Sequence, residues 1–527
     1  MSPFSLAAAA VAVAFVYYIC PARLQWIVLL AASCLLYAQN GAQPLAFLLL
    51  TAASTWAASL LIHRIGRRAA QAAHTGGAPL PREEKKRLKA RARRRQRAVF
   101  FAVLLLNFGI LALLKYAHAG TEQTLLRLLG AVGSGGGFRL LVPLGISFYT
   151  FQSMGYLIDV YNGKYPPERN PARFLLFVSF FPQMVQGPIG RYDHLAPQLT
   201  APHRPDLKNI RYGLILMLWG FFKKKVIADR ALEFVQAVFS DHTPYGGAVI
   251  AVSVLLYSLQ QYCDFSGGID LVTGAAEVLG IHLAPNFKRP YFSVSLGDFW
   301  RRWHISLGAW MRDYVFYPFA LTRPMRLLSK ALKKTAGAEI ARAMPAALGN
   351  ILVFLLVGVW HGASMNYVLW GLYNGVILAV SALMEPAYKR FGETHAALVK
   401  SRGFHILRVL RTFLIVNIGW YFDRCADFRD ALAMLGKTVF SPRLWQLTDG
   451  TLFSLGLTLK GFSLLGASAA LLFAVSLAQE RGIRVRPWLD SLRLPARWAL
   501  LYGLILVSIL FSVSGSGFSS GFIYAMF

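Results

Sequence analysis

Long apolar runs separated by short basic blocks recur along the whole chain. Because about 20 apolar residues are needed for a helix to cross a bilayer, these runs predict transmembrane helices. They lie at residues 4–19, 25–38, 44–62, 99–116, 209–222, 246–262, 351–380, 405–421, 461–477 and 498–513. Two further segments, 142–164 and 177–191, are apolar but interrupted by proline, glycine and glutamine, which favours broken or re-entrant helices around an internal cavity. We therefore predict an all-α polytopic membrane protein with roughly ten to twelve transmembrane or re-entrant helices in a single integral-membrane domain, 1–527.

Composition supports this class. Of the 527 residues, 56% are hydrophobic and 15% are charged, whereas a soluble domain carries about 25% charged residues. A soluble multi-domain enzyme is therefore excluded. The four cysteines are scattered through mostly apolar surroundings and form no CxxC or zinc-ligand spacing, so we expect neither a disulfide framework nor a metal site.

The net charge of +31 comes from basic blocks between the apolar runs, as the positive-inside rule predicts. The most basic block, 64–97, is expected to be a cytoplasmic loop or surface helix on anionic lipid, and the three crossings before it place the N-terminus outside. Lys223–Lys225 ends a later run and is expected to mark the cytoplasmic face. The charge is accompanied by no nucleic-acid-binding motif, so nucleic acid is not an expected partner.

One apolar run contains a single histidine. In residues 351–380 the only ionisable group that titrates near neutral pH is His361, between Trp360 and Gly362. An ionisable side chain at membrane depth is costly and indicates a functional site. The run is interrupted near His361, so it forms either one tilted span or two shorter helices.

A second histidine, His304, stands in the segment FWRRWHIS at 299–306. Neutral imidazole can take a proton from a hydroxyl and return one to a leaving group, which is the chemistry of acyl transfer. From residue chemistry alone, His361 fits either a catalytic or a structural hydrogen-bonding role. His304, beside Arg301 and Arg302, fits a headgroup or phosphate contact at least as well. The sequence contains no P-loop, dinucleotide fingerprint, GxSxG elbow or HExxH motif.

Four segments together resemble a known family. They are IGRYDHLAPQL (189–199), CDFSGGIDL (263–271), NFKRPYFSVSLGDFWRRWHISLGAWMRDYVFYP (286–318) and GVWHGASMNYVLWGLYNG (358–375). In this order they resemble the membrane-bound O-acyltransferase superfamily, and within it the bacterial branch of alginate O-acetylase, peptidoglycan O-acetyltransferase and the teichoic-acid D-alanyl transfer protein. The resemblance makes 142–380 the expected catalytic core and 400–527 the C-terminal transmembrane helices.

The resemblance implies a helical ring around a central chamber, with His361 as the catalytic histidine and His304 in the same chamber. It implies no bound cofactor. The acyl donor would be a cytoplasmic thioester, acetyl-CoA or a phosphopantetheinyl carrier protein, in the bacterial cytoplasmic (inner) membrane. The acyl group would pass outward to an extracytoplasmic, esterase-like transferase that modifies a cell-envelope or exported polysaccharide. The expected chamber-lining or supporting residues are Trp303, Arg301, Arg302, Asp264, Asn286, Trp360, Asn366 and Gln183.

Two features leave the branch open. Gln183 stands where many alginate-type members have histidine, and the segment between His304 and His361 is longer than such members would have. Its basic portion, Arg323–Arg342, could dock an acidic acyl carrier protein. D-alanyl transfer toward teichoic acid is therefore the alternative to acetyl transfer. A transporter or flippase is the alternative of another class, since broken helices suit transporters too, although no internal repeat is apparent.

Overall fold

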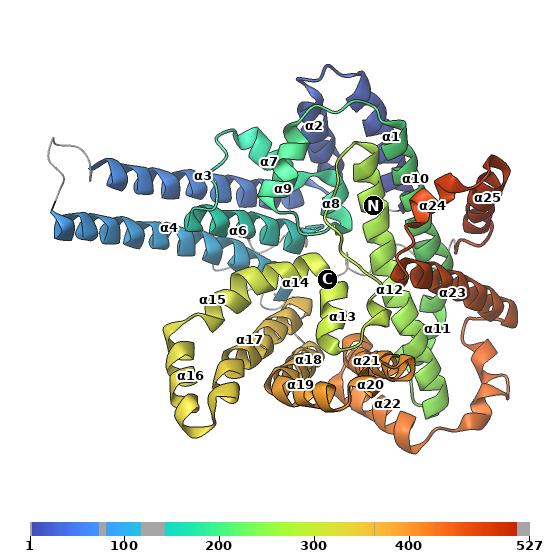
Figure 1. Ribbon diagram of the computed structural model, residues 1–527. Helices are drawn as coiled ribbons and strands as arrows, with labels where there is room; N and C mark the ends of the chain where they lie inside the picture. Colours follow the sequence, from blue (N-terminus) through green and yellow to red (C-terminus); the bar gives the residue numbers. More distant parts are fainter. Residues whose placement is uncertain (1–2, 73–80, 117–142, 363, 514–527) are drawn as a thin grey trace, which may run out of the picture. The chain divides into compact units, whose positions relative to one another are not determined.

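The computed structural model describes residues 3–72, 81–116, 143–362 and 364–513. Every secondary-structure element in these ranges is a helix (Figure 1), which confirms the predicted all-α class. Among the described residues, six helices are long and apolar enough to cross a membrane, so this is a multi-pass membrane protein: α3 (Ala42–Ala72), α4 (Arg82–Tyr116), α12 (Gly247–Val278), α17 (Ala338–His361), α18 (Met365–Leu383) and α23 (Leu459–Glu480). Three shorter helices are also apolar: α1 (Pro3–Ile19), α2 (Gln25–Ala38) and α25 (Leu494–Leu510).

The chain forms two compact units, whose boundaries fall within α10 (Leu207–Phe221) and α12. The first comprises Pro3–Gly213 and Ala275–Ala284, and the second comprises Leu214–Gly274 and the residues from Pro285 onward. The predicted core, 142–380, is thus distributed over both units. Residues 73–80 of the predicted basic loop, residues 142 and 363 of the core and residues 514–527 of the predicted C-terminal region lie outside the described ranges.

In the first unit, α3 and α4 run side by side as a long hairpin (Figure 1). Polar contacts join them, because Asn107 Nδ2 donates to Ser54 Oγ (3.2 Å) and Gln96 Nε2 donates to the Ile62 carbonyl (2.9 Å). The surface helix expected within 64–97 and the apolar run at 99–116 form one unbroken helix, α4. The hairpin therefore extends beyond its apolar portion into the basic segment.

The interior of the first unit is built on α6 (Ile146–Asn162), of whose 17 residues 14 are buried. Beside it, the segment at 177–191 is broken as predicted, because Phe180 separates α7 (Pro171–Ser179) from α8 (Phe181–Gln186). The break predicted for 142–164 is absent from its described residues, because α6 is one continuous helix. Gln183 Nε2 donates to the Pro188 carbonyl (2.9 Å) within this segment. The remaining helices here are α7 (Pro171–Ser179), α8 (Phe181–Gln186) and α9 (Tyr192–Thr200).

In the second unit, α17 and α18 pack against each other at unusually close range. A Cβ on Gly358 would lie 2.2 Å from the Tyr367 carbonyl oxygen, and one on Gly371 would lie 2.4 Å from that of Phe354. Glycine at both positions is therefore what permits the approach. The run at 351–380 forms two helices that separate after His361, which settles the question that the sequence left open.

The second unit contains further helices of 3 to 23 residues. They are the π-helices η1 (Phe222–Ala228) and η3 (Arg312–Phe316), the 3₁₀ helices η2 (Pro290–Phe292), η4 (Leu444–Leu447) and η5 (Thr451–Ser454), and the α-helices α11 (Asp229–Ser240), α13 (Leu296–Arg302), α14 (Ile305–Met311), α15 (Tyr317–Ala320), α16 (Arg323–Thr335), α19 (Glu385–Thr394), α20 (Ala396–Lys400), α21 (Arg402–Arg424), α22 (Phe428–Phe440) and α24 (Val485–Ser491).

Candidate active site

His304 lies at the break between α13 and α14. Its backbone is left-handed, with φ 45° and ψ 52°, a conformation that few residues other than glycine adopt. Ser295 caps the start of α13 by accepting from the Asp298 backbone N–H (3.1 Å). Backbone conformations of this kind gather at functional sites, so the break itself singles out His304.

Asn286 fixes the orientation of the His304 ring. Its Oδ1 accepts from the backbone N–H (3.0 Å) and hydroxyl (2.9 Å) of Ser306 and lies 3.3 Å from His304 Nδ1. Because an amide oxygen only accepts, a hydrogen bond here requires the proton on Nδ1. In neutral imidazole that tautomer places the lone pair on Nε2, which is then the proton acceptor.

The His304 imidazole is neutral at physiological pH. It lies outside the six candidate spans, is 4% exposed, and packs edge-to-face against Phe265 with ring centroids 4.8 Å apart. Burial lowers the pKa of this imidazole to about 3, because an apolar environment disfavours the charged form. The ring therefore carries a lone pair at neutral pH that can accept a hydrogen bond, while the same low pKa makes it a weak proton acceptor.

His361 ends α17 and is enclosed by aromatic rings. Its ring centroid lies 4.9 Å from that of Trp360, 5.1 Å from that of Trp370 and 5.8 Å from that of Tyr367. Trp360 also lies 6.3 Å from the His304 ring, so it contacts both histidines. The close approach of α17 and α18 at Gly358 positions this aromatic cage.

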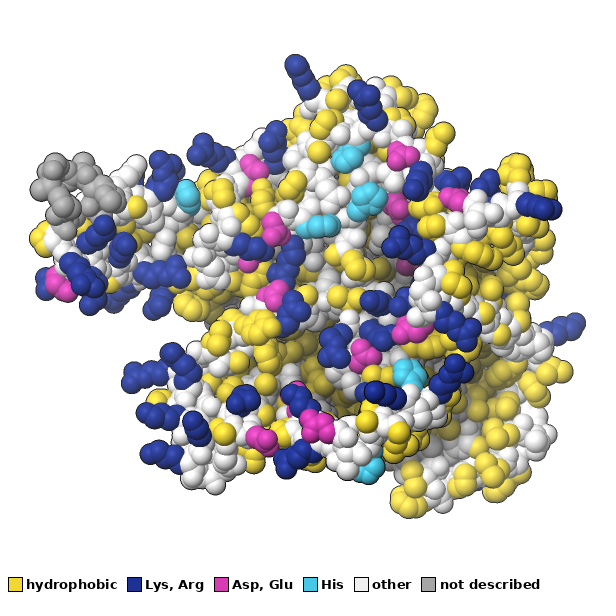
Figure 2. All heavy atoms as spheres, in the orientation of Figure 1, with side chains coloured by type: hydrophobic (Ala, Val, Ile, Leu, Met, Phe, Trp, Pro, Cys, Tyr) yellow, Lys and Arg dark blue, Asp and Glu magenta, His cyan; other side chains and the backbone are white. Residues whose placement is uncertain are grey.

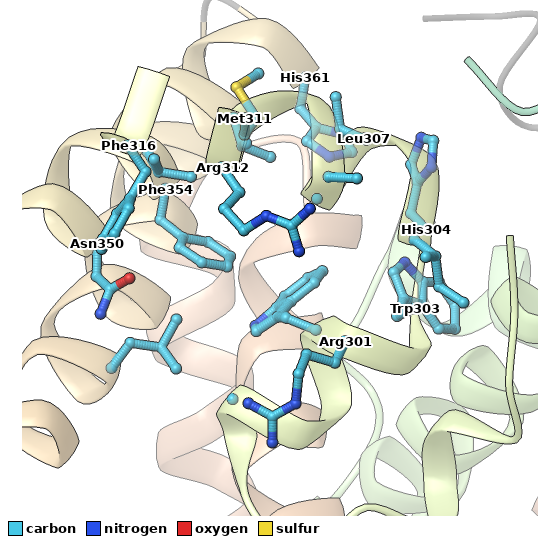
Figure 3. Close-up of a pocket in the computed structure, with 18 of the residues that line it drawn as sticks. Arg301, Trp303, His304, Leu307, Met311, Arg312, Phe316, Asn350, Phe354 and His361 are labelled. Atoms are coloured by element: carbon cyan, nitrogen blue, oxygen red, sulfur yellow. The ribbon is translucent and has the colours of Figure 1, made fainter. Parts of the chain in front are cut away.

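Both histidines line one pocket of about 440 Å³ in the second unit. Figure 3 shows His361, Arg312 and Arg301 reaching into it, with His304 and Trp303 along one wall. Arg301 is 71% exposed along its side chain, so the pocket opens at the surface on that side. The volume lies within the range of ordinary small-molecule sites, about 300–1,000 Å³.

Of the ten residues that the sequence singled out, four line this pocket: His304, His361, Trp303 and Arg301. Asn286 and Trp360 do not line the pocket, but each contacts the His304 ring. Arg302 pairs with Glu480 (3.0 Å), and Asn366 Nδ2 donates to the Cys425 carbonyl (2.5 Å). Gln183 belongs to the first unit and does not line this pocket. Asp264 does not line it either, and forms an ion pair with Lys224 in a buried network.

That network corrects an expectation. Lys223–Lys225 does not form an exposed boundary at the membrane face, because all three side chains are buried. Lys224 pairs with Asp264 and with Asp229 (2.9 Å), Lys225 with Asp229 (2.6 Å), and Lys223 with Asp270 (2.7 Å). The π-helical backbone of η1 carries the three lysines. Asp264 immediately precedes Phe265, the ring that packs on His304.

Most of the other pocket residues were not found from the sequence, among them Arg312, Asn350 and Asp423. Asp423 Oδ2 accepts a hydrogen bond from the Tyr257 hydroxyl (2.6 Å) and brings a carboxylate to the pocket. A carboxylate directly after the apolar run at 405–421 was the available signal. Arg312 lies in the resemblance segment 286–318, but nothing in its neighbourhood distinguished it from surface arginines. Within the described residues, no group of three or more His, Cys, Asp or Glu side chains could hold a metal ion.

Comparison with known proteins defines the class. Residues 168–332 match the model of the MBOAT, membrane-bound O-acyltransferase family. The chain therefore carries a domain of this family. The matched range includes His304 and the ion-pair network, and it ends before His361.

Individual relatives point to the bacterial branch. The chain is 34% identical over 352 residues to the probable alginate O-acetylase AlgI of Pseudomonas syringae, covering 66% of this chain and 61% of that protein. It is 34% identical to the peptidoglycan O-acetyltransferase of Helicobacter pylori, covering 56% of each. It is 29% identical to the teichoic acid D-alanyltransferase of Bacillus subtilis, covering 54% of this chain and 69% of that protein. The chain thus spans less than two thirds of the length of the alginate relative.

Proposed function

We propose that this protein is a membrane-bound O-acyltransferase that takes an acetyl group from a cytoplasmic thioester and passes it across the membrane. The acetyl group would be used for O-acetylation of a cell-envelope or exported polysaccharide. The observation that carries the proposal is that His304 and His361, from separate segments, line one pocket. Relatives named as an alginate O-acetylase and a peptidoglycan O-acetyltransferase support the acetyl group and the polysaccharide acceptor.

In the proposed reaction, His361 accepts the proton of a hydroxyl on the extracytoplasmic partner, and that oxygen bonds to the thioester carbonyl carbon, so the partner carries the acetyl group to the polysaccharide. The carbon–sulfur bond then breaks, and the thiolate takes up the proton to leave as a thiol. His304, whose neutral imidazole presents Nε2 as acceptor, assists at the same pocket. The pocket holds two arginines, Arg301 and Arg312, that can stabilise the negative charge developing on the carbonyl oxygen.

Membrane location and partners complete the proposal. The protein would lie in the bacterial inner membrane with its basic 64–97 segment in the cytoplasm and its N-terminus outside. An extracytoplasmic esterase-like partner would transfer the acyl group to the polysaccharide. The donor, acetyl-CoA or an acylated carrier protein, is consumed as a substrate.

D-alanyl transfer is the second candidate, and it rests on α16. This helix carries five exposed basic residues, a surface suited to an acidic carrier protein. We expect that reversing Lys330, Lys333 and Lys334 to Glu abolishes activity that depends on such a carrier. Activity that is unchanged by the reversal would exclude carrier docking at α16.

The donor can be tested with inverted membrane vesicles supplied with acetyl-CoA labelled in the acetyl group. We expect the label to appear as alkali-labile ester with the wild-type protein and to be absent with His361→Gln. His405→Gln, an exposed histidine on α21, is the matched control and should behave as wild type. Label transfer that persists in folded His361→Gln would contradict the proposed role of this residue.

A further inference from the structure

A second pocket, of about 520 Å³, lies in the first unit along the basic end of α3. Arg64, Arg67, Arg68 and Arg169 line it together with His63, and the buried Pro167 forms part of its wall. No aspartate or glutamate is among its lining residues. We call the site the arginine pocket and define it by these four arginines.

Within the described ranges, no carboxylate forms an ion pair with the arginines of the arginine pocket. Glu168, next to Arg169, is engaged elsewhere, since its carboxylate accepts from the Tyr192 hydroxyl (2.8 Å) and the Asn170 backbone N–H (2.8 Å). Arg64, Arg67 and Arg68 stand three and four residues apart on one helix face, a spacing at which like charges destabilise a helix. A bound anion would remove that repulsion.

The frame of the pocket is fixed by contacts within the first unit. Trp56 Nε1 donates to the Glu168 carbonyl (3.0 Å), and the Glu168 backbone N–H donates to the Tyr156 hydroxyl (2.8 Å), so the loop that carries Arg169 is tied to its neighbours. Away from the pocket lining, Arg93 of α4 lies over the Tyr161 ring at 3.9 Å and donates to the Tyr161 carbonyl (3.0 Å), which ties α4 to α6. The arginines are thus presented by a preformed frame.

The position of the pocket along α3 indicates where its ligand comes from. The apolar run of this candidate span ends at Ile62, and Arg64 follows two residues later. The end of a span lies at the level of the lipid headgroups. Figure 2 shows Lys and Arg side chains gathered over α3 and α4 on the visible face. Arginine guanidinium groups bind phosphate oxygens in a bidentate manner, which suits this chemistry.

We propose that the arginine pocket binds the phosphate of an anionic lipid headgroup. This inference is independent of acyl transfer. It differs from a general attraction of basic segments to an anionic surface, because it assigns the binding to four named side chains around one cavity. The same phosphate chemistry could come from solution, and the experiment separates the two sources.

The test is binding of fluorescent phosphatidylglycerol to the purified full-length protein in neutral detergent micelles, with phosphatidylcholine as the zwitterionic comparison. The pocket variant is Arg64→Gln/Arg67→Gln/Arg68→Gln. The control variant, Arg91→Gln/Arg94→Gln/Arg95→Gln, removes the same charge from exposed positions on α4 outside the pocket. Arg169→Gln tests the loop side of the pocket alone.

We expect the affinity for phosphatidylglycerol to fall at least tenfold in the pocket variant, several-fold in Arg169→Gln, and less than twofold in the control variant. An equal loss in both triple variants would show a general basic surface and overturn the proposal. Equal affinity for phosphatidylcholine would also overturn it. Displacement of the lipid by millimolar inorganic phosphate or by coenzyme A would show that the source is a soluble phosphate, contrary to the lipid assignment.

Discussion

Lys224 offers a sharp test of how the site is held together. Its side chain is 4% exposed, and its ammonium group pairs with Asp264 and Asp229, whose side chains are 2% and 1% exposed. The three lysines of η1 balance three aspartates, so Lys224→Met leaves one buried negative charge uncompensated. Removing one partner of a buried ion pair destabilises a protein by about 3–5 kcal/mol.

We therefore expect Lys224→Met to lower the free energy of unfolding by about 3–5 kcal/mol. The double variant Lys224→Met/Asp264→Asn restores neutrality, and we expect it to recover more than half of that loss. The assay is denaturant unfolding of the detergent-purified protein, followed by tryptophan fluorescence. Lys389→Met, an exposed lysine on α19 that is paired only at the surface, is the control and should change stability by less than about 1 kcal/mol.

Two results would refute this reasoning. If Lys224→Met were as stable as the control, the buried network would contribute nothing to the fold. If the double variant were no more stable than the single variant, charge imbalance would not be the cause of the loss.

Three other predictions concern neighbouring features. Gly358→Leu places a side chain against the Tyr367 carbonyl, which a Cβ alone would approach to 2.2 Å, so we expect loss of folded protein on size-exclusion chromatography. Gly392→Leu, with open space around it, should remain folded. Burial lowers the pKa of His304 to about 3 in the folded protein. Below pH 6.5 this histidine therefore takes up a proton in the unfolded chain but stays neutral in the folded protein. Stability is therefore lost as the pH falls, by about 2 kcal/mol at pH 5, and His304→Gln should abolish this part of the pH dependence of unfolding. Asn286→Leu leaves the His304 ring without its hydrogen-bond acceptor, and we expect the acyl-transfer activity of this variant to fall at least tenfold. Asn286→Asp keeps an oxygen acceptor, and we expect it to retain more activity than Asn286→Leu.

The fold class could be predicted because it depends on local signals, since apolar runs of membrane length indicate the helices. Residue chemistry singled out His304 and His361 but left their roles open, and only the family resemblance placed both in one chamber. The break after His361 was also visible, since glycine follows it directly.

Other features depend on contacts between distant segments and could not be read from the sequence. Lys223–Lys225 has the composition of a membrane boundary, and only packing against Asp264 and Asp270 of α12 makes it an interior network. A carboxylate after the apolar run at 405–421 marks Asp423 as unusual, but its contact with Tyr257, 166 positions away in the chain, is a long-range contact that no local pattern reveals. Arg312 is the first residue of the π-helix η3, and no sequence pattern predicted a π-helix there.

The measurement that tests the central claim most directly is mass spectrometry of alkali-released ester groups from the cell envelope and exported polysaccharide. It compares cells that lack the protein with cells that carry the wild type, His361→Gln or His405→Gln. The account predicts that acetate is lost without the protein, is restored by the wild type and by His405→Gln, and is not restored by His361→Gln. Acetate that is unchanged in all four strains, or that is restored by His361→Gln, would contradict the proposed acetyl transfer. If D-alanine instead were lost without the protein and restored only by the wild type and His405→Gln, the donor would be an acylated carrier protein.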